Sequence, residues 1–84
     1  MNNQPHPLFI NIEFEINKSK LILQTTSNTA IENLIRNFRS RLCNEIKIDK
    51  YIIESTNIEL DPTSTETLSS KGITHNTKIV VLTK

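Results

Sequence analysis

The stretch TLSSKGITHNTKIVVL, residues 67–82, carries the strongest structural signals in this sequence. Its first half is a polar turn with an isolated glycine, Gly72, which is suited to a left-handed backbone conformation. Its second half, KIVVL (78–82), is rich in β-branched residues and predicts a strand. Alternate residues of a strand share a face, so one face carries Ile79 and Val81, and the other carries Lys78, Val80 and Leu82.

Length and composition limit the chain to one small domain. The sequence has 84 residues and a formal net charge of +1, which favours neither a nucleic-acid partner nor an acidic one. A single cysteine, Cys43, cannot form an internal disulfide, as is typical of a reducing compartment. Neither an apolar run of ~20 residues nor a targeting segment is recognisable. We therefore expect an intracellular protein, in the cytoplasm or the nucleus, without a membrane span.

The N-terminal part predicts a leader followed by a β-hairpin. Residues 1–8 are polar with two prolines and predict a flexible leader, and the folded domain is expected over 9–84. FINIEFEI (9–16) alternates between apolar and polar residues, which is typical of a half-buried strand. NKSK (17–20) is a polar turn, and KLILQTT (20–26) predicts the second strand.

The middle of the chain changes to helical periodicity. Apolar residues recur at helical spacing and predict a helix over residues 30–44: Ile31, Leu34, Ile35, Phe38 and Leu42. Thr29 and Glu32 have the spacing of a capping box, in which each side chain bonds the backbone of the other residue.

Two further extended segments follow the helix. KYIIES (50–55) predicts a strand, and residues 56–60 predict a short one. One helix with strands on both sides of it in the sequence predicts an α+β fold. We expect a β-grasp arrangement, a mixed sheet of four to five strands packed on the helix, with the last strand between the first and the third.

Three segments resemble ubiquitin and the wider ubiquitin and SUMO superfamily. TAIENLIRNF (29–38) is similar to the opening of ubiquitin's helix, and YIIESTNIEL (51–60) to its third strand and the short strand that follows. TLSSKGI (67–73) is similar to the Thr-Leu-Ser turn before the last strand. The resemblance covers residues 9–84, with a shorter first turn and a longer loop at 60–67.

The C-terminus departs from the ubiquitin pattern. Ubiquitin-type modifiers end in a flexible Gly-Gly tail, whereas this sequence ends in Thr83 and Lys84. The resemblance therefore implies a non-catalytic protein-protein interaction module, a subunit or adaptor within a larger assembly or a ligand of a receptor for ubiquitin-like folds, which is not conjugated as it stands. The alternative is a covalent modifier whose Gly-Gly tail lies beyond Lys84 or was removed.

The resemblance also implies a protein-binding surface. Ile52 aligns with the Ile of ubiquitin's recognition patch, Leu82 with its Val and Val80 with its His, and Ile16 or Asn17 is nearest to its Leu. Lys78 and Lys84 are expected to give this surface a mildly basic rim.

A second candidate is a groove between the second strand and the helix. SUMO-like domains accept an extended strand there, and the lining residues would be Lys20, Ile22, Ile35 and Arg39. The nearby basic cluster of Arg36, Arg39 and Arg41 is interpreted as a solvated helix face; an acidic protein groove or RNA is the alternative. The modest charge and the scarcity of aromatic residues argue against nucleic acid.

No constellation for catalysis, cofactors or metals is recognisable. His6 and His75 have no neighbouring Cys or helical partner that would indicate a metal site. Cys43 has no evident base. Glu13 and Glu15 are expected to pair with Lys20 or Lys78 on adjacent strands.

Overall fold

The computed structural model describes residues 9–42 and 46–84. The chain order is β1 (Phe9–Ile16), β2 (Ser19–Thr26), α1 (Ile31–Ser40), β3 (Ile48–Ile53), β4 (Ile58–Leu60), the short 3-10 helix η1 (Ser69–Lys71) and β5 (Thr77–Thr83). The predicted leader at residues 1–8, with His6, and the thiol of Cys43 lie outside the described residues. No helix in the described part of the chain is long and apolar enough to cross a membrane.

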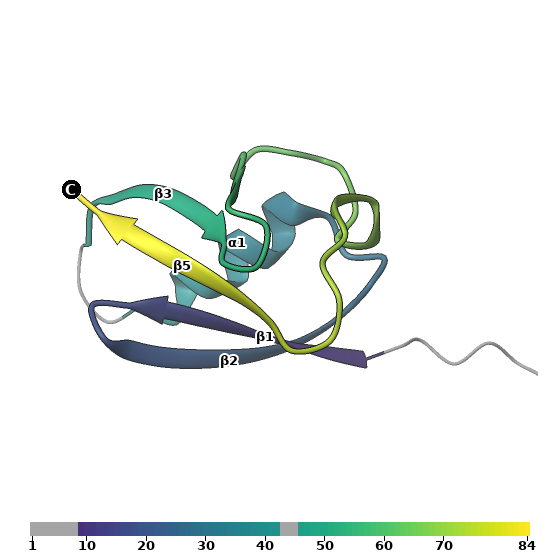
Figure 1. The fold of residues 1–84 in the computed structure, drawn as a ribbon, viewed down its shortest axis with the longest axis horizontal. Helices are drawn as coiled ribbons and strands as arrows, with labels where there is room; N and C mark the ends of the chain where they lie inside the picture. Colours follow the sequence, from purple (N-terminus) through teal and green to yellow (C-terminus); the bar gives the residue numbers. More distant parts are fainter. Residues whose placement is uncertain (1–8, 43–45) are drawn as a thin grey trace, which may run out of the picture.

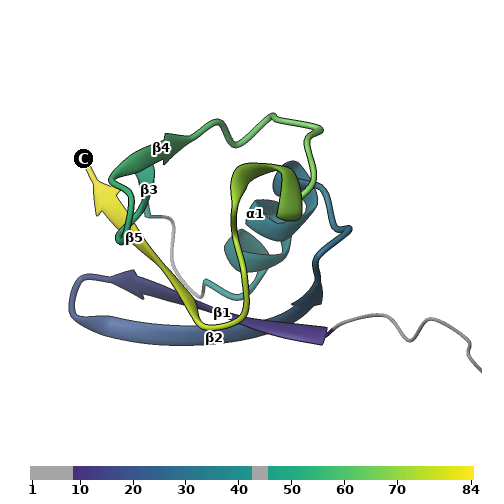
Figure 2. The ribbon, with the colours of Figure 1, turned by 45° about the vertical axis from the view of Figure 1, so that its right-hand side comes forward.

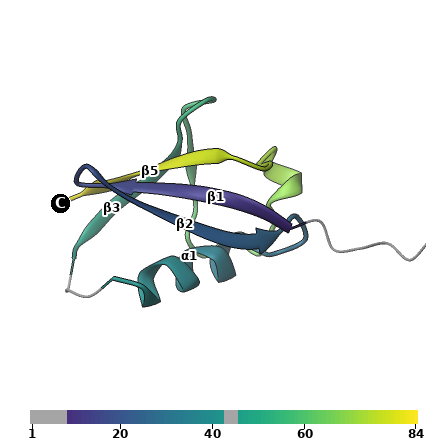
Figure 3. The same ribbon diagram turned by 90° about the horizontal axis from the view of Figure 1, so that it is seen from below.

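All five strands belong to one mixed sheet in the order β2-β1-β5-β3-β4. The last strand lies in the centre, parallel to β1 and antiparallel to β3. Helix α1 covers one face of the sheet, as Figure 3 shows from the side. In Figure 1 the β1–β2 turn, the start of β3 and the end of β5 lie at the same end of the molecule. The predicted α+β class, β-grasp topology and strand order are confirmed.

The core lies between the sheet and α1, where the apolar residues of both periodic patterns meet. Phe14 of β1 and Phe38 of α1 are both fully buried. Their rings stack with centroids 4.2 Å apart and an interplanar angle of 13°. Tyr51 of β3 meets Phe38 edge-on at 6.2 Å and 86°. Aromatic pairs favour both geometries, so these three rings connect β1, α1 and β3.

The predicted capping box at the start of α1 is wrong. Ala30 is the N-cap residue, and no side chain bonds the first turn. The hydroxyl of Thr29 instead lies 2.9 Å from that of Thr25 and 3.0 Å from that of Thr26. Contacts with hydroxyl groups three and four residues earlier, at the end of β2, thus replace the bond that the sequence spacing predicted.

Backbone from a distant loop satisfies the first turn of α1. The N–H of Ile31 donates to the carbonyl of Glu66, and the N–H of Glu32 donates to that of Ser64, both at 2.9 Å. The loop after β4 therefore lies against the start of the helix, as Figure 2 shows. These bonds satisfy donors that would otherwise have no partner at a helix start, and they give the long 60–67 loop a structural role.

The helix is shorter than its apolar spacing predicts. Periodicity extends to Leu42, but α1 ends at Ser40 and Arg41 is its C-cap residue. The N–H groups of Arg41 and Leu42 donate to carbonyls three residues earlier, at 3.0 and 3.2 Å. This tightening ends the α-helical ladder, and Leu42 still packs against the core from outside the helix.

The third strand occupies residues 48–53 and not the predicted 50–55. Residues after Ile53 form a turn, in which the N–H of Asn57 donates to the carbonyl of Ile53 at 2.7 Å. Asn57 has a φ of 59°, a left-handed conformation that Asn tolerates better than most residues. The turn explains why β4 starts only at Ile58.

The turn at 67–73 connects the long loop to β5. Leu68 and Ile73 are buried, and the N–H of Leu68 donates to the carbonyl of Thr29 at 2.9 Å. Gly72 follows η1 with a φ of 74°, as predicted for this position. Two buried side chains thus anchor the turn and deliver the chain to the central strand.

Candidate functional site

The outward face of the sheet, opposite α1, brings three predicted site residues together. Ile52 of β3 lies directly opposite Val80 of β5. Leu82 lies two residues further along β5, on the same face as Val80, and is opposite Lys50. Leu82 is 41% exposed, while Ile52 and Val80 are partly buried. We name Ile52, Val80 and Leu82 the apolar patch. Neighbours in the sheet register form a contiguous surface.

Ile16, the fourth apolar candidate, is not part of this patch. It is only 6% exposed and pairs with the buried Val81, on the face that α1 covers. Period-two alternation of β1 fixes this orientation, because Ile16 shares a face with Ile12 and Phe14. The adjacent Asn17 is exposed in the β1–β2 turn with a φ of 49°.

Lys78 lies at the centre of an acidic cluster beside the patch. Its Nζ is 2.6 Å from Glu15 Oε1, 3.4 Å from Glu54 Oε2 and 3.9 Å from Glu13 Oε2. The hydrogen bond with Lys78 lowers the pKa of Glu15, and the same bond raises the pKa of Lys78. The predicted pairing of Glu13 and Glu15 with Lys78 is confirmed.

The rim around the apolar patch is consequently mixed and not basic. The carboxylates of Glu13 and Glu15 on β1 and of Glu54 after β3 outweigh the single charge of Lys78. On the opposite side, Glu59 of β4 lies opposite Ile52, while Lys50 flanks Leu82. The sequence analysis overlooked Lys50, Glu54 and Glu59, although the period of two already places Lys50 and Glu54 on the same face as Ile52.

The second predicted groove is not assembled. Ile22 is 61% exposed and pairs with Glu13 on the outward face, and Lys20 pairs with Glu15 on that same face. Ile35, in contrast, is 2% exposed on α1. Alternation along β2 directs Lys20 and Ile22 away from the helix, so they cannot line a groove with Ile35 and Arg39.

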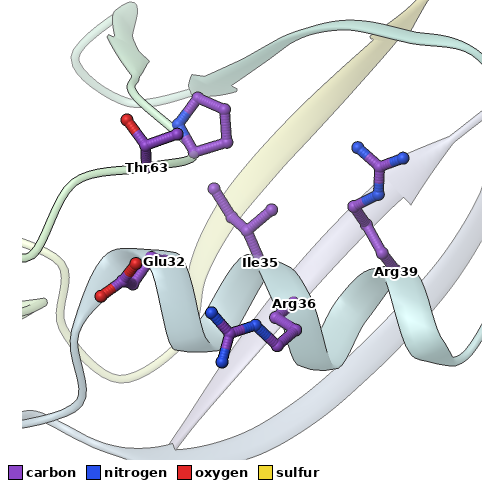
Figure 4. A pocket seen from close by; sticks show the side chains of 6 residues that line it. Glu32, Ile35, Arg36, Arg39 and Thr63 are labelled. Carbon is purple, nitrogen blue, oxygen red and sulfur yellow. The ribbon is translucent and has the colours of Figure 1, made fainter.

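Ile35 and Arg39 instead face the loop after β4. They line a cleft together with Glu32, Arg36, Pro62 and Thr63, and Figure 4 shows Thr63 across from the helical residues. Arg41, the third member of the predicted basic cluster, is exposed beyond the end of α1 and does not line the cleft.

The side chain of His75 accepts a hydrogen bond from the backbone of β1. The backbone N–H of Asn11 donates to His75 Nδ1 at 3.0 Å, which connects the loop before β5 to β1. Within residues 9–42 and 46–84, no three His, Cys, Asp or Glu side chains converge in a way that could hold a metal ion.

Comparison with known proteins identifies the fold through solved structures. No protein-family profile and no curated protein matches the sequence. The ubiquitin-like domain of an Arabidopsis thaliana protein superposes with a TM-score of 0.77, over 100% of this chain and 93% of that one, at 19% identity. The chain has the ubiquitin-like β-grasp fold.

Two further structures agree with the ubiquitin-like fold. The N-terminal ubiquitin-like domain of the 4931431F19Rik protein has a TM-score of 0.70 at 17% identity, over 99% of this chain and 82% of that one. A design based on ubiquitin has a TM-score of 0.64 at 16% identity, over 90% and 89% of the two chains. At these identities the likeness concerns the fold, and the site must be argued from the residues of this chain.

Proposed function

We propose that this ubiquitin-like domain is a non-catalytic protein-binding module that uses the apolar patch to bind a protein partner. One observation carries the proposal: Ile52, Val80 and Leu82 are neighbours in the register of β3 and β5, on the face that α1 leaves uncovered. A contiguous group of partly exposed apolar side chains is typical of an interface, whereas scattered ones are common on any surface.

Binding would remove the remaining exposed apolar surface of the patch from water. A fully buried aliphatic side chain gains ~1.5–3 kcal/mol relative to an exposed one. Leu82, at 41% exposed, has the largest such gain still available within the patch. The charged rim of Glu15, Glu59 and Lys50 would set the orientation of the partner more than the affinity. The proposed partner thus presents an apolar surface with charges of both signs around it.

The proposed setting is a larger assembly inside the cell, in the cytoplasm or the nucleus, in which this domain is a subunit or an adaptor. The fold has no evident catalytic constellation in the described residues, and the exposed features of the sheet face are those of a recognition surface. In such an assembly, a neighbouring protein would cover the apolar patch.

The test is affinity purification from the native cell with the wild-type chain and two variants. Leu82→Ala truncates the patch, while Ile22→Ala truncates an equally aliphatic side chain on the same sheet face, separated from the patch by Glu13 and Glu15. We expect Leu82→Ala to weaken binding of the recovered partner by ~1–2 kcal/mol, and Ile22→Ala to leave it unchanged. Equal binding by Leu82→Ala and wild type refutes the proposal.

A parallel purification under denaturing conditions tests the alternative of a covalent modifier. Recovery of only the 9.6 kDa chain after denaturation supports non-covalent binding. A ladder of heavier linked species would instead establish conjugation through residues beyond Lys84.

A further inference from the structure

A second surface lies on the helix side of the molecule, away from the apolar patch. It is an open cleft of about 410 Å³ between α1 and the loop after β4. In Figure 4, Glu32, Ile35 and Arg39 follow one side of the helix, and Thr63 lies across from them. Six residues from these two segments line it: Glu32, Ile35, Arg36, Arg39, Pro62 and Thr63.

The loop wall of this cleft is held in place by hydrogen bonds. Asp61 Oδ1 accepts from the backbone N–H of Thr63 at 2.9 Å and from its hydroxyl at 2.7 Å. The backbone N–H of Ser64 donates to the carbonyl of Asp61, and the carbonyl of Ser64 accepts from Glu32 of α1. The two walls are therefore joined at one end, and a ligand meets a preorganised surface.

Two arginines lie on the helix wall without an anionic partner among the described residues. All ion pairs found there involve Lys71 or Lys78. Arg36 reaches only the amide oxygen of Asn33, at 3.5 Å. Both arginines are exposed, so their guanidinium groups are accessible to a ligand.

Arg39 lies beside a buried phenol. The Tyr51 hydroxyl is inaccessible to solvent. Burial raises the pKa of Tyr51, and the neighbouring Arg39 opposes this shift. A neutral phenol cannot neutralise a guanidinium, so the positive charge of Arg39 remains available at this end of the cleft.

We propose that this cleft binds an acidic segment of a partner protein. The guanidinium groups of Arg36 and Arg39 would pair with carboxylates, for which the planar fork of arginine is well suited. The exposed Pro62 would contact an apolar side chain between those carboxylates, whereas Ile35, at 2% exposed, offers little surface to a ligand. Glu32, the single acidic residue of the lining, gives the cleft an uneven distribution of charge along its length. This asymmetry favours one direction of the bound segment.

The lining favours a peptide over a nucleic acid. Single-stranded nucleic acid requires a groove that tracks many phosphates and exposed aromatic rings on which bases stack. This cleft offers two arginines and no aromatic lining residue.

The probe is a synthetic peptide with the sequence Glu-Glu-Leu-Val-Glu-Glu, capped at both ends, titrated into the 15N-labelled full chain. The reference probe replaces each Glu by Gln. We expect the acidic peptide to shift the amide resonances of Glu32, Arg36, Arg39 and Thr63. The Gln peptide is expected to bind about tenfold more weakly, since it loses two exposed ion pairs and each changes affinity by up to about fivefold.

Matched variants separate specific binding from general charge attraction. The double variant Arg36→Gln and Arg39→Gln is expected to weaken binding of the acidic peptide by about tenfold. Arg41→Gln removes the same kind of charge outside the cleft and is expected to change affinity less than twofold. Both arginines of the double variant are exposed, so the fold itself should be retained.

Three outcomes would overturn the proposal. One is the absence of shifts at millimolar peptide. Another is a shift pattern confined to the sheet face around Leu82. The third is stronger binding of a single-stranded RNA oligonucleotide to the same arginines. The apolar patch has its own test, the loss of partner binding in Leu82→Ala, so failure of the cleft proposal and failure of the patch proposal are distinguishable.

Discussion

Replacement of Phe38 by Ala tests the packing that joins α1 to the sheet. The ring of Phe38 is fully buried, stacks on Phe14 at 4.2 Å and meets Tyr51 edge-on at 6.2 Å. Truncation removes both ring contacts and leaves a cavity between three elements. Phe14 and Tyr51 lie on rigid strands of one sheet, so they can close this cavity only in part.

The expected loss is large relative to the stability of so small a domain. A buried Phe→Ala change costs ~3–5 kcal/mol in free energy of unfolding. A domain of 84 residues is expected to have about 4–13 kcal/mol in total. Phe38→Leu keeps most of the volume but loses two ring contacts that contribute ~0.5–1.5 kcal/mol each, so we expect a loss of about 1–3 kcal/mol.

Urea unfolding followed by far-UV circular dichroism measures these differences, with thermal unfolding as a second readout. A change of 1 kcal/mol shifts the Tm of a domain of this size by ~4–8 °C, so Phe38→Ala should lower it by at least about 12 °C. Asn37→Ala, an exposed neighbour on the same helix, is the matched control and should stay within ~0.5 kcal/mol of wild type.

A loss below about 1 kcal/mol for Phe38→Ala, with an unchanged slope against urea, would refute the ring cluster as the centre of the core. If Phe38→Ala does not fold at all, Phe38→Leu still decides the question. The free energy of unfolding of Phe38→Leu must then be lower than that of wild type by the amount that the lost ring contacts imply, while the variant still folds.

Two further predictions concern charge and backbone conformation. The pKa of Glu15 is lowered from 4.5, so the stabilisation from its ion pair is present above pH 4.5 and is lost as pH falls through its folded-state pKa. The pKa of Lys78 is raised from 10.5, so the stabilisation from its ion pairs is present below pH 10.5 and is lost as pH rises through its folded-state pKa. We expect Glu15→Gln to be less stable than wild type in urea at pH 7 but equal to it at pH 2, and a difference that persists in acid would contradict the ion pair. Gly72→Ala should destabilise by ~1–2 kcal/mol through its left-handed φ of 74° alone, since no atom lies within 4 Å of an added Cβ. Gly72→Asn should cost less in the same urea assay because Asn tolerates this conformation, and equal losses would argue against a backbone cause.

Local periodicity was sufficient for the elements and for most of the apolar patch. FINIEFEI alternates, so its inward and outward faces followed without knowledge of its neighbours. The spacing of Ile31, Leu34 and Phe38 predicted the buried side of α1 in the same way. Val80 and Leu82 share a strand face by sequence alone, and the resemblance to ubiquitin supplied the neighbouring strand that carries Ile52.

Features that depend on residues distant in the sequence could not be predicted in this way. The start of α1 has the spacing of a capping box, but backbone carbonyls of the loop after β4 satisfy its first N–H groups. The predicted groove failed for a different and local reason, because alternation along β2 already directs Lys20 and Ile22 to the sheet face opposite the helix.

The sequence by itself thus determined the type of each element, the face that each element buries and the left-handed position at Gly72, because these depend on local backbone geometry. Tertiary structure decided which faces meet. Pairing of β5 with β1 on one side and with β3 on the other places Lys78 among three carboxylates. The β4–η1 loop closes over α1 and forms the arginine-lined cleft. Both features depend on contacts between segments far apart along the chain, which no local period encodes.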